Sequence, residues 1–183
     1  MRKRWQAFES MLMRVVVTAF LFACVFCFPP VFALADDAQE RAEKIKIAYL
    51  FHFSQFTEWA VKPSVFTYCV YDDVHFSERL QQAYTGKTLG TLQIAVQAVN
   101  AQSNFDNCHL LYFPNKAPNE ILSQLQKKPI LTVGEQKNFF EQGIIYLFED
   151  NQKIRFFINN AAATSANLKI NSQLLSLSKE PQS

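Results

Sequence analysis

Residues 66–71 read Phe-Thr-Tyr-Cys-Val-Tyr (FTYCVY), a run of aromatic and β-branched side chains that predicts a β-strand. A helix is predicted over residues 76–84 and ends near Gly86. Residues 92–99 then alternate apolar and polar side chains, as a half-buried strand does. A strand, a helix and a second strand in this order favour a parallel pair covered by helices.

The alternation of helices and strands continues along the chain on both sides of this unit. A first helix is predicted over residues 40–59, where apolar side chains follow helical spacing. Further strands are expected at residues 108–113, 129–133, 144–148 and 153–158, and helices at residues 118–127, before Gly143 and within residues 161–177. Residues 149–152 join the last two strands in a hairpin-type turn. The order predicts an α/β three-layer sandwich with a mainly parallel sheet of about six strands and a C-terminal antiparallel hairpin.

The first 35 residues follow the pattern of a secretory signal peptide. Three basic residues, Arg2, Lys3 and Arg4, precede an apolar run over residues 15–28, and Ala33-Leu34-Ala35 offers a signal peptidase site. We therefore expect cleavage after Ala35. The mature protein would be a single domain over residues 36–178, with a disordered tail at residues 179–183.

Two other interpretations of this N-terminal segment remain. The residues between Arg14 and Asp36 carry no charge and are about enough to span a bilayer, so the segment could be an uncleaved anchor. A lipoprotein would need Cys24 as the modified residue, and Phe22 fits that site poorly. The paired prolines at residues 29–30 and the alanine site favour cleavage.

Charge and cysteine content change once residues 1–35 are removed. The remaining 14 basic and 15 acidic residues give a net charge of −1, which offers no electrostatic reason to bind nucleic acid or anionic lipid. Cys69 and Cys108 are the cysteines that remain, and an exported protein allows one disulfide between them. Two buried free thiols are the alternative. The spacing is not C-x-x-C, which favours a structural or redox-sensing bond over a catalytic one.

Sequence motifs of enzymes are sparse. The chain has no G-x-G-x-x-G, P-loop, G-x-S-x-G or H-E-x-x-H sequence, and its four glycines do not cluster. We therefore expect no enzyme activity, no cofactor and no metal. Asp72, Asp73 and His75 follow the first strand, where ligand loops of open α/β sheets lie. They could form an acid-base or metal site, but an aspartate that caps the next helix is favoured because no second cluster supplies ligands.

The histidines and aromatic residues allow further alternatives. His52 lies within the first predicted helix and is expected to be partly buried rather than a ligand. A Cys108–His109 nucleophile pair is excluded if Cys108 is in a disulfide. Neighbours in a strand point to opposite faces, so either Phe157 or Phe156 is exposed or partner-covered, or the sheet is buried on both sides. Exposed aromatics would mark a protein interface. Aromatic residues are concentrated in one segment, at Phe51, Phe53, Phe56 and Trp59, and in the adjacent pairs Phe139-Phe140 and Phe156-Phe157.

Taken in order, these segments resemble the YfiR family of small periplasmic regulators. The resemblance covers nearly the whole mature chain. The segments that carry it are residues 46–59 (KIAYLFHFSQFTEW), 68–70 (YCV), 108–112 (CHLLY), 129–135 (PILTVGE), 154–159 (IRFFIN) and 168–177 (LKINSQLLSL). Their order and spacing, together with the signal peptide, make the resemblance specific although no single segment is decisive.

The resemblance implies a non-enzymatic periplasmic regulator that forms a homodimer. Such a regulator binds the periplasmic sensor domain of an inner-membrane diguanylate cyclase and represses it, which lowers cyclic di-GMP and disfavours biofilm. No nucleic acid partner and no membrane insertion after signal cleavage are expected. The alternative is a periplasmic module that senses a small ligand for a histidine kinase or a transporter.

The resemblance also assigns roles to individual residues. Cys69 and Cys108 stand where family members carry a disulfide. A second disulfide of some relatives has no counterpart here, because residues 135–146 contain no cysteine. The partner surface would involve the last strand and the helix after it, at Phe157, Asn159 and Ala163. Phe157 stands where some relatives place an acidic residue, which implies a partner surface with different binding properties.

Overall fold

The computed structural model describes residues 32–181. The predicted signal peptide, its membrane-anchor and lipoprotein alternatives, and residues 182–183 of the predicted tail therefore lie outside the described residues, apart from the last few positions before the expected cleavage site. Helix α2 spans Phe32–Gln55. The chain divides into two units, residues 1–41 and 42–183, and everything described below belongs to the second.

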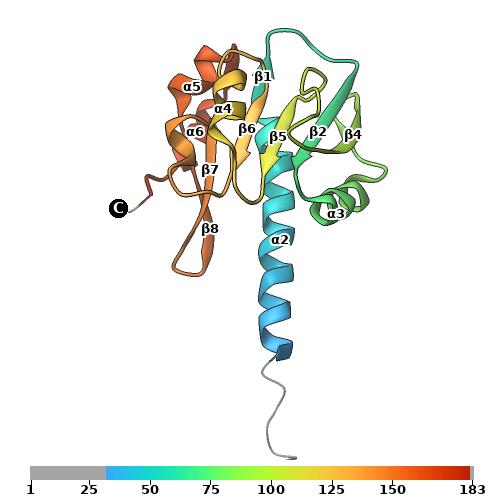
Figure 1. The fold of residues 1–183 in the computed structure, drawn as a ribbon, viewed down its shortest axis with the longest axis vertical. Helices are drawn as coiled ribbons and strands as arrows, with labels where there is room; N and C mark the ends of the chain where they lie inside the picture. The colour runs from blue at the N-terminus through green and yellow to red at the C-terminus, as the bar shows by residue number, and fades with distance from the viewer. Residues whose placement is uncertain (1–31, 182–183) are drawn as a thin grey trace, which may run out of the picture. The chain divides into compact units, whose positions relative to one another are not determined.

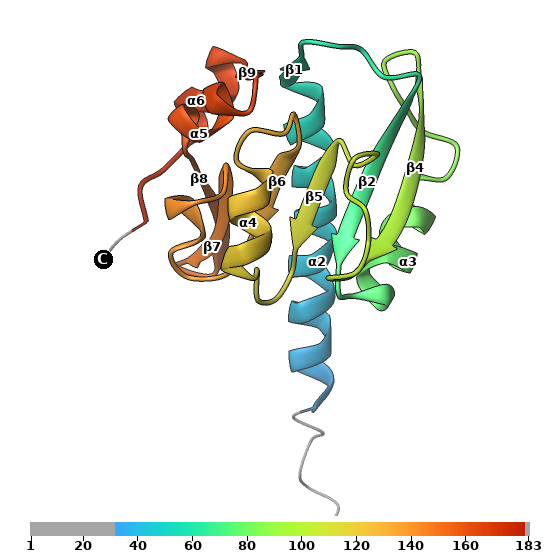
Figure 2. The same cartoon turned by 45° about the horizontal axis from the view of Figure 1, so that its top comes forward.

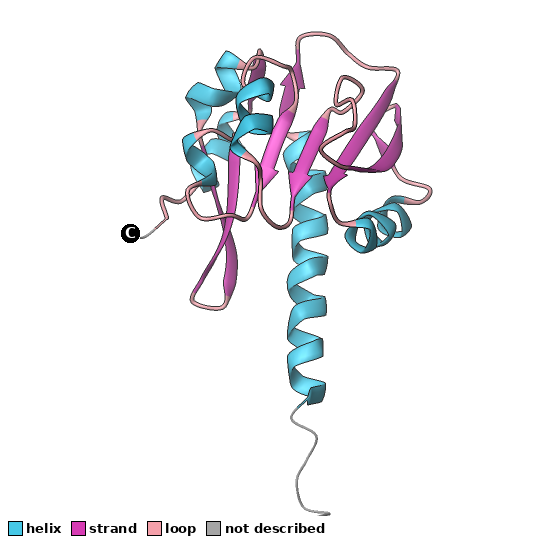
Figure 3. Ribbon diagram, viewed as in Figure 1, coloured by secondary structure: helices cyan, strands magenta, loops and turns pink. Residues whose placement is uncertain are grey.

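A seven-stranded sheet forms the centre of this unit, and its strands follow the order β3-β4-β2-β5-β6-β7-β8 (Figures 1 and 3). The strands are β2 (Val65–Tyr71), β3 (Thr88–Leu89), β4 (Leu92–Val99), β5 (Leu110–Phe113), β6 (Leu131–Gly134), β7 (Ile145–Asp150) and β8 (Lys153–Ile158). Strands β4, β2, β5, β6 and β7 pair in parallel, whereas β3 and β8 are antiparallel edge strands. The predicted mainly parallel sheet with a C-terminal antiparallel hairpin is confirmed.

Helices and loops cover both faces of this sheet (Figure 2). The remaining elements are α3 (Val74–Tyr84), α4 (Asn119–Leu125), the 3-10 helix η1 (Phe139–Glu141), α5 (Asn160–Ser165) and α6 (Ser172–Leu177). One buried cluster joins α2, α3 and α5 to one face of the sheet, with Tyr68 and Tyr112 fully buried in it. A second cluster joins α4 and η1 to the opposite face and contains Cys69 and Cys108. These layers agree with the predicted α/β sandwich.

A small second sheet corrects two predicted helices. Strand β1 (Thr57–Trp59) pairs antiparallel with β9 (Leu168–Ile170), so the first helix ends before Thr57 and the C-terminal helical region is interrupted. Leu168 and Ile170 are buried whereas Lys169 between them is exposed, which is the alternation of a strand rather than a helix. The indole N–H of Trp59 also donates to the Pro129 carbonyl at 2.9 Å, which holds β1 in place.

The C-terminal hairpin has the geometry that its sequence predicts. Asn151 and Gln152 both have positive φ, at 50° and 60°, as a two-residue turn of type I′ requires. Asparagine tolerates this left-handed conformation better than most residues. The turn therefore sets the register in which Asp150 faces Lys153 and Tyr146 faces Phe157.

Candidate functional site

Asp72, Asp73 and His75 lie at the start of helix α3. The Asp73 carboxylate accepts from the Phe76 backbone N–H at 2.8 Å and caps α3. Asp72 has a positive φ of 53° and His75 is exposed on the first turn of the helix. Within residues 32–181 no group of three or more His, Cys, Asp or Glu side chains is arranged to hold a metal ion. The capping alternative is therefore confirmed.

The other two candidate histidines of the described region, His52 and His109, lie in different environments. His52 is exposed on α2, contrary to the expectation that it is partly buried. His109 precedes β5, and its Nδ1 accepts from the Thr67 backbone N–H at 3.1 Å. Burial lowers the pKa of His109. The imidazole is therefore held in the neutral tautomer with the proton on Nε2, and it serves as a strand-pairing group between β2 and β5.

The predicted disulfide between Cys69 and Cys108 is present. Their Cα atoms are 5.7 Å apart, and both residues are buried, with Cys69 in the middle of β2 and Cys108 at the end of the β4–β5 loop. The bond ties that loop to the sheet. Because its sulfur is bonded, Cys108 is not a nucleophile, and the Cys108–His109 pair is excluded as a catalytic site.

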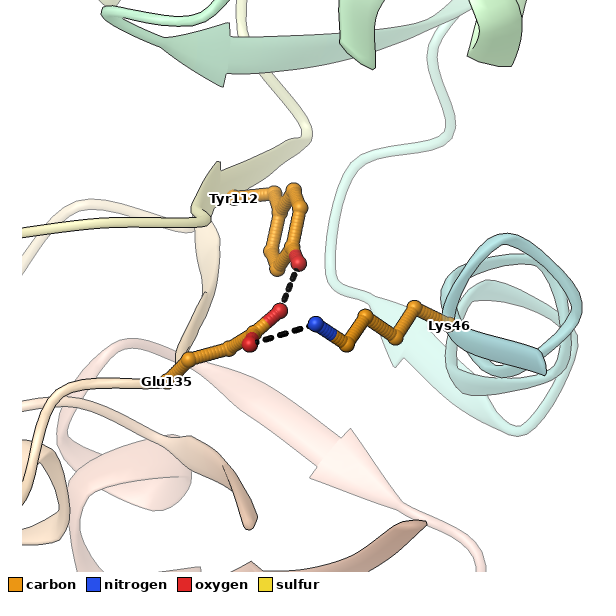
Figure 4. Close-up of polar contacts among 3 residues, drawn as sticks. All are labelled: Lys46, Tyr112 and Glu135. Atoms are coloured by element: carbon orange, nitrogen blue, oxygen red, sulfur yellow. Dashed lines mark hydrogen bonds and ion pairs between the residues drawn. The ribbon is translucent and has the colours of Figure 1, made fainter. Parts of the chain in front are cut away.

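A polar network joins α2 to the carboxyl ends of the parallel strands (Figure 4). Lys46 Nζ on α2 lies 2.6 Å from Glu135 Oε2, immediately after β6. The other oxygen of Glu135 accepts from the hydroxyl of Tyr112 on β5. The Lys46 and Glu135 side chains are 23% and 22% exposed, so solvent screens this ion pair only in part. One carboxylate thus connects a helix and two strands.

The electrostatics of this network favour structure over proton transfer. Burial raises the pKa of Tyr112, and the negative charge of Glu135 raises it further. The hydroxyl therefore remains protonated and donates to the carboxylate throughout the neutral range. A second ion pair lies on the same helix, where Arg79 Nε of α3 is 2.8 Å from Glu43 Oε1. These contacts position α2 against the sheet.

Four aromatic side chains from η1 and the β7–β8 hairpin contact one another in a chain, and we name them the aromatic patch. Phe140 of η1 lies 5.9 Å from Tyr146 and 5.7 Å from Phe157, between ring centroids. Tyr146 in turn stacks on Phe148 at 5.3 Å. Tyr146 is nearly buried, whereas Phe140, Phe148 and Phe157 are partly exposed. Phe156, which precedes Phe157, is 5% exposed and faces the opposite core.

The three residues proposed from the resemblance lie close together in sequence but have different environments. Phe157 is in the aromatic patch. Asn159 caps α5 by accepting from Ala162 N–H at 2.9 Å, and its side-chain amide donates to the Phe140 carbonyl at 2.9 Å. Ala163 belongs to α5 and is fully buried. The structure thus brings Phe157 and Asn159 together through Phe140 and places Ala163 below the surface.

A cavity of about 460 Å³ lies at the amino ends of the parallel strands, away from the Lys46–Glu135–Tyr112 network at their carboxyl ends. Its walls are mainly apolar and include Trp59, Val61 and Pro129. His109 and the ion pair between Asp106 and Lys128, 2.7 Å apart, supply its polar groups. A volume of this size and a mainly apolar lining also occur in small-molecule sites.

Sequence reasoning missed the Lys46–Glu135–Tyr112 network and the two patch residues on β7. Lys46 and Glu135 both lie in segments that carry the resemblance, yet nothing local shows that two residues so far apart meet. Tyr146 and Phe148 alternate along one strand, and this spacing could have indicated that they share a face with Phe157 once the hairpin register was known.

The described helices and a comparison with known proteins each add one finding. Among the helices of residues 32–181, none combines the length and the apolar character needed to cross a bilayer. A family model described as YfiR/HmsC-like matches residues 43–179, which include the whole sheet, the disulfide, the polar network and the aromatic patch. The chain therefore belongs to the YfiR/HmsC-like family.

Proposed function

We propose that this protein is a non-enzymatic regulator of the periplasm. In this proposal it binds the periplasmic sensor domain of an inner-membrane diguanylate cyclase, holds the cyclase inactive and lowers cyclic di-GMP. Membership of the YfiR/HmsC-like family supports the proposal, because the family resemblance implies this role. A disulfide between Cys69 and Cys108 is compatible with an oxidising compartment.

The observation that carries the proposal is the aromatic patch. Phe140, Phe148 and Phe157 are partly exposed, Phe140 contacts Phe157, and Tyr146 connects Phe140 to Phe148. Scattered apolar side chains are common on protein surfaces, but a contiguous aromatic group is typical of an interaction site. Aromatic side chains are also enriched where partners bury surface.

The residues around the patch have distinct parts in this proposal. Phe157 would contact the partner directly. Asn159 would position the patch, because its amide holds the backbone of Phe140. Ala163 would act only through packing, since no part of its side chain reaches the surface.

Photo-cross-linking in the native host tests the proposal. A photoreactive phenylalanine analogue replaces Phe148 in the patch, and a second variant carries it at Phe51, which lies on α2 and packs beside Tyr84. The expected product, at Phe148 only, is a membrane protein with a diguanylate cyclase domain. Equal products at both positions, or none at Phe148, would remove the patch from the interface.

A pair of charge variants tests the same surface by function. Phe157→Asp should weaken binding of the sensor domain at least about tenfold, or about 1.4 kcal/mol, and raise cellular cyclic di-GMP. Val74→Asp is the matched control, because Val74 is 59% exposed at the start of α3. Both variants should keep the wild-type melting temperature. Equal binding by the two variants would contradict a contact role for Phe157.

A small-ligand sensor is the second candidate function, and the 460 Å³ cavity favours it. Aromatic and proline walls with a neutral imidazole suit a small, mostly apolar ligand. A ligand that fills this cavity should raise the melting temperature as its concentration increases. Val61→Trp should abolish that rise, because Val61 lines the cavity and is 83% exposed, so its replacement does not disturb the core.

A further inference from the structure

Strand β8 forms an open edge of the seven-stranded sheet. The Asn159 backbone N–H donates to the Ile144 carbonyl at 2.8 Å, so these two residues form a hydrogen-bonded pair that continues the β7–β8 ladder. Because such pairs alternate along an antiparallel ladder, the backbone groups of Ile154, Phe156 and Ile158 point away from β7. These three residues present the hydrogen-bonding groups of the sheet edge.

Other parts of the same chain already occupy three of these groups. The Ile158 N–H donates to Ser178 Oγ at 2.9 Å. The Lys179 N–H donates to the Phe156 carbonyl at 2.9 Å. The Tyr49 hydroxyl of α2 donates to the Ile154 carbonyl at 3.2 Å. The chain therefore returns to β8 after α6, and Figure 2 shows the C-terminal end beside this strand.

The returning segment, residues 178–181, has the sequence Ser-Lys-Glu-Pro, and we name it the edge guard. Its charged residues and its proline are those with which proteins prevent an edge strand from pairing with another chain. Ser178 accepts a bond from β8 through its side-chain oxygen, and Lys179 donates one to β8 through its backbone N–H. A segment that ends in Glu180 and Pro181 offers no regular new edge for a further strand. The predicted disorder from residue 179 onward therefore does not describe Lys179, whose N–H is bonded.

We infer that the edge guard prevents β8 from pairing with β8 of a second copy of this chain. A two-fold antiparallel pair centred on Phe156 would place Ile154 opposite Ile158 of the second copy. The outward N–H and C=O groups of these three residues would then be paired between the copies, with the Ile154 carbonyl accepting from Tyr49 as well. The occupant of the unguarded edge is thus a second copy in one defined register.

The side chains of β8 agree with this register. Arg155 would lie opposite Phe157 of the second copy, which places a guanidinium group beside an aromatic ring. Lys153 would lie opposite Asn159, so no like charges face each other across the pair. Arg155 and Phe157 are both partly exposed, although Arg155 lies 3.9 Å from Asp150 of its own hairpin and Phe157 packs on Phe140. The inference does not depend on the proposed cyclase partner.

A shortened chain tests the inference. The mature protein that ends at residue 183 is compared with one that ends at Leu177, by sedimentation equilibrium and by amide hydrogen exchange. The shortened chain should self-associate at least tenfold more tightly, and its Phe156 amide should exchange more slowly as concentration rises. Equal association of both chains, or exchange at Phe156 that does not change with concentration, would overturn the inference.

Point variants separate the edge guard from general effects of truncation. Lys179→Pro removes the N–H that donates to Phe156, whereas Lys179→Ala retains it. Only the proline variant should associate as the shortened chain does. In the shortened chain, Phe157→Lys would place a lysine opposite Arg155 of the second copy and should reverse the association. Association that is the same for Lys179→Pro and Lys179→Ala, or that survives Phe157→Lys, would exclude this register.

Discussion

Lys46 Nζ lies 2.6 Å from Glu135 Oε2, although 89 residues separate them in the sequence. The first residue belongs to the helix that precedes the sheet, and the second follows the fourth parallel strand in chain order. Through Tyr112 the same carboxylate also reaches the neighbouring strand β5. A single carboxylate at the carboxyl edge of the sheet therefore contributes to the position of α2 and links it to two strands.

Two replacements of Glu135 should destabilise the fold to different extents. Glu135→Gln removes the charge but leaves an acceptor for Tyr112, so we expect a loss of about 1 kcal/mol. Glu135→Ala leaves the buried Tyr112 hydroxyl without an acceptor and should cost about 1–3 kcal/mol more. Urea denaturation measures both variants. Glu58→Gln is the control, because the Glu58–Lys169 pair is largely exposed and its loss should change stability little. Equal stability of the glutamine and alanine variants at residue 135 would contradict the bond to Tyr112.

Removal of the disulfide should lower stability more than any surface change. Cys69 and Cys108 lie 39 residues apart, and their bond restricts the unfolded chain over that loop. We expect Cys69→Ser to cost about 2–5 kcal/mol under oxidising conditions. The same loss should appear in the wild-type protein after reduction and should be absent when reductant is added to the Cys69→Ser variant. A melting temperature that is independent of reductant would show that the bond contributes nothing.

Much of the fold could be predicted from local patterns. Strands β4 and β8 were predicted with the observed bounds, β4 because alternation of side chains is visible within a few residues. The hairpin was predicted from its polar turn, and Asn151 there adopts the left-handed conformation that asparagine tolerates. By contrast, β1 and β9 have three residues each and pair across more than 100 positions, as Glu58 and Lys169 do. Such short strands carry too little local signal to be distinguished from helix ends.

The candidate site was predictable to a similar extent. The adjacent pair Phe156-Phe157 indicated opposite faces, and the structure places Phe156 in the core and leaves Phe157 partly exposed. The partners of Phe157 could not be foreseen, because η1 brings Phe140 to the patch through a loop of irregular backbone. The Lys46–Glu135 pair was missed for the same reason, since only the tertiary arrangement brings a helix and a strand end together.

His109 should make stability depend on pH. Burial lowers the pKa of His109 in the folded protein, so the unfolded chain binds the proton more readily. Stability from this group is therefore complete above about pH 6.5, where both states are neutral, and decreases as the pH falls from there toward the folded pKa. Protonation also replaces the acceptor of the Thr67 N–H with a second donor.

Two asparagine variants test this dependence. His109→Asn should lessen the loss of stability between pH 7 and pH 5, because its side-chain oxygen can accept from Thr67 without titrating. His75→Asn is the control for the substitution itself, since His75 is exposed on the first turn of α3. The Asp106–Lys128 pair, which also faces the cavity, remains in both variants. A pH profile of His109→Asn that matches wild type would remove His109 as the cause.

Two glycines should prove necessary for the aromatic patch. The ring of Phe139 lies against both Gly134 and Gly143, and a Cβ atom at either position would overlap it. Gly143→Ala should therefore displace Phe139 and cost about 1–3 kcal/mol. Because Phe140 follows directly in η1, the same change should move its ring away from Phe157 and weaken partner binding. Phe139→Leu in the Gly143→Ala background should restore part of the stability, because a leucine side chain lacks the ring that the added methyl group would overlap. Urea denaturation and sensor-domain binding, measured on both variants, check these effects, and an unchanged Gly143→Ala protein would show that Phe139 adapts without disturbing η1.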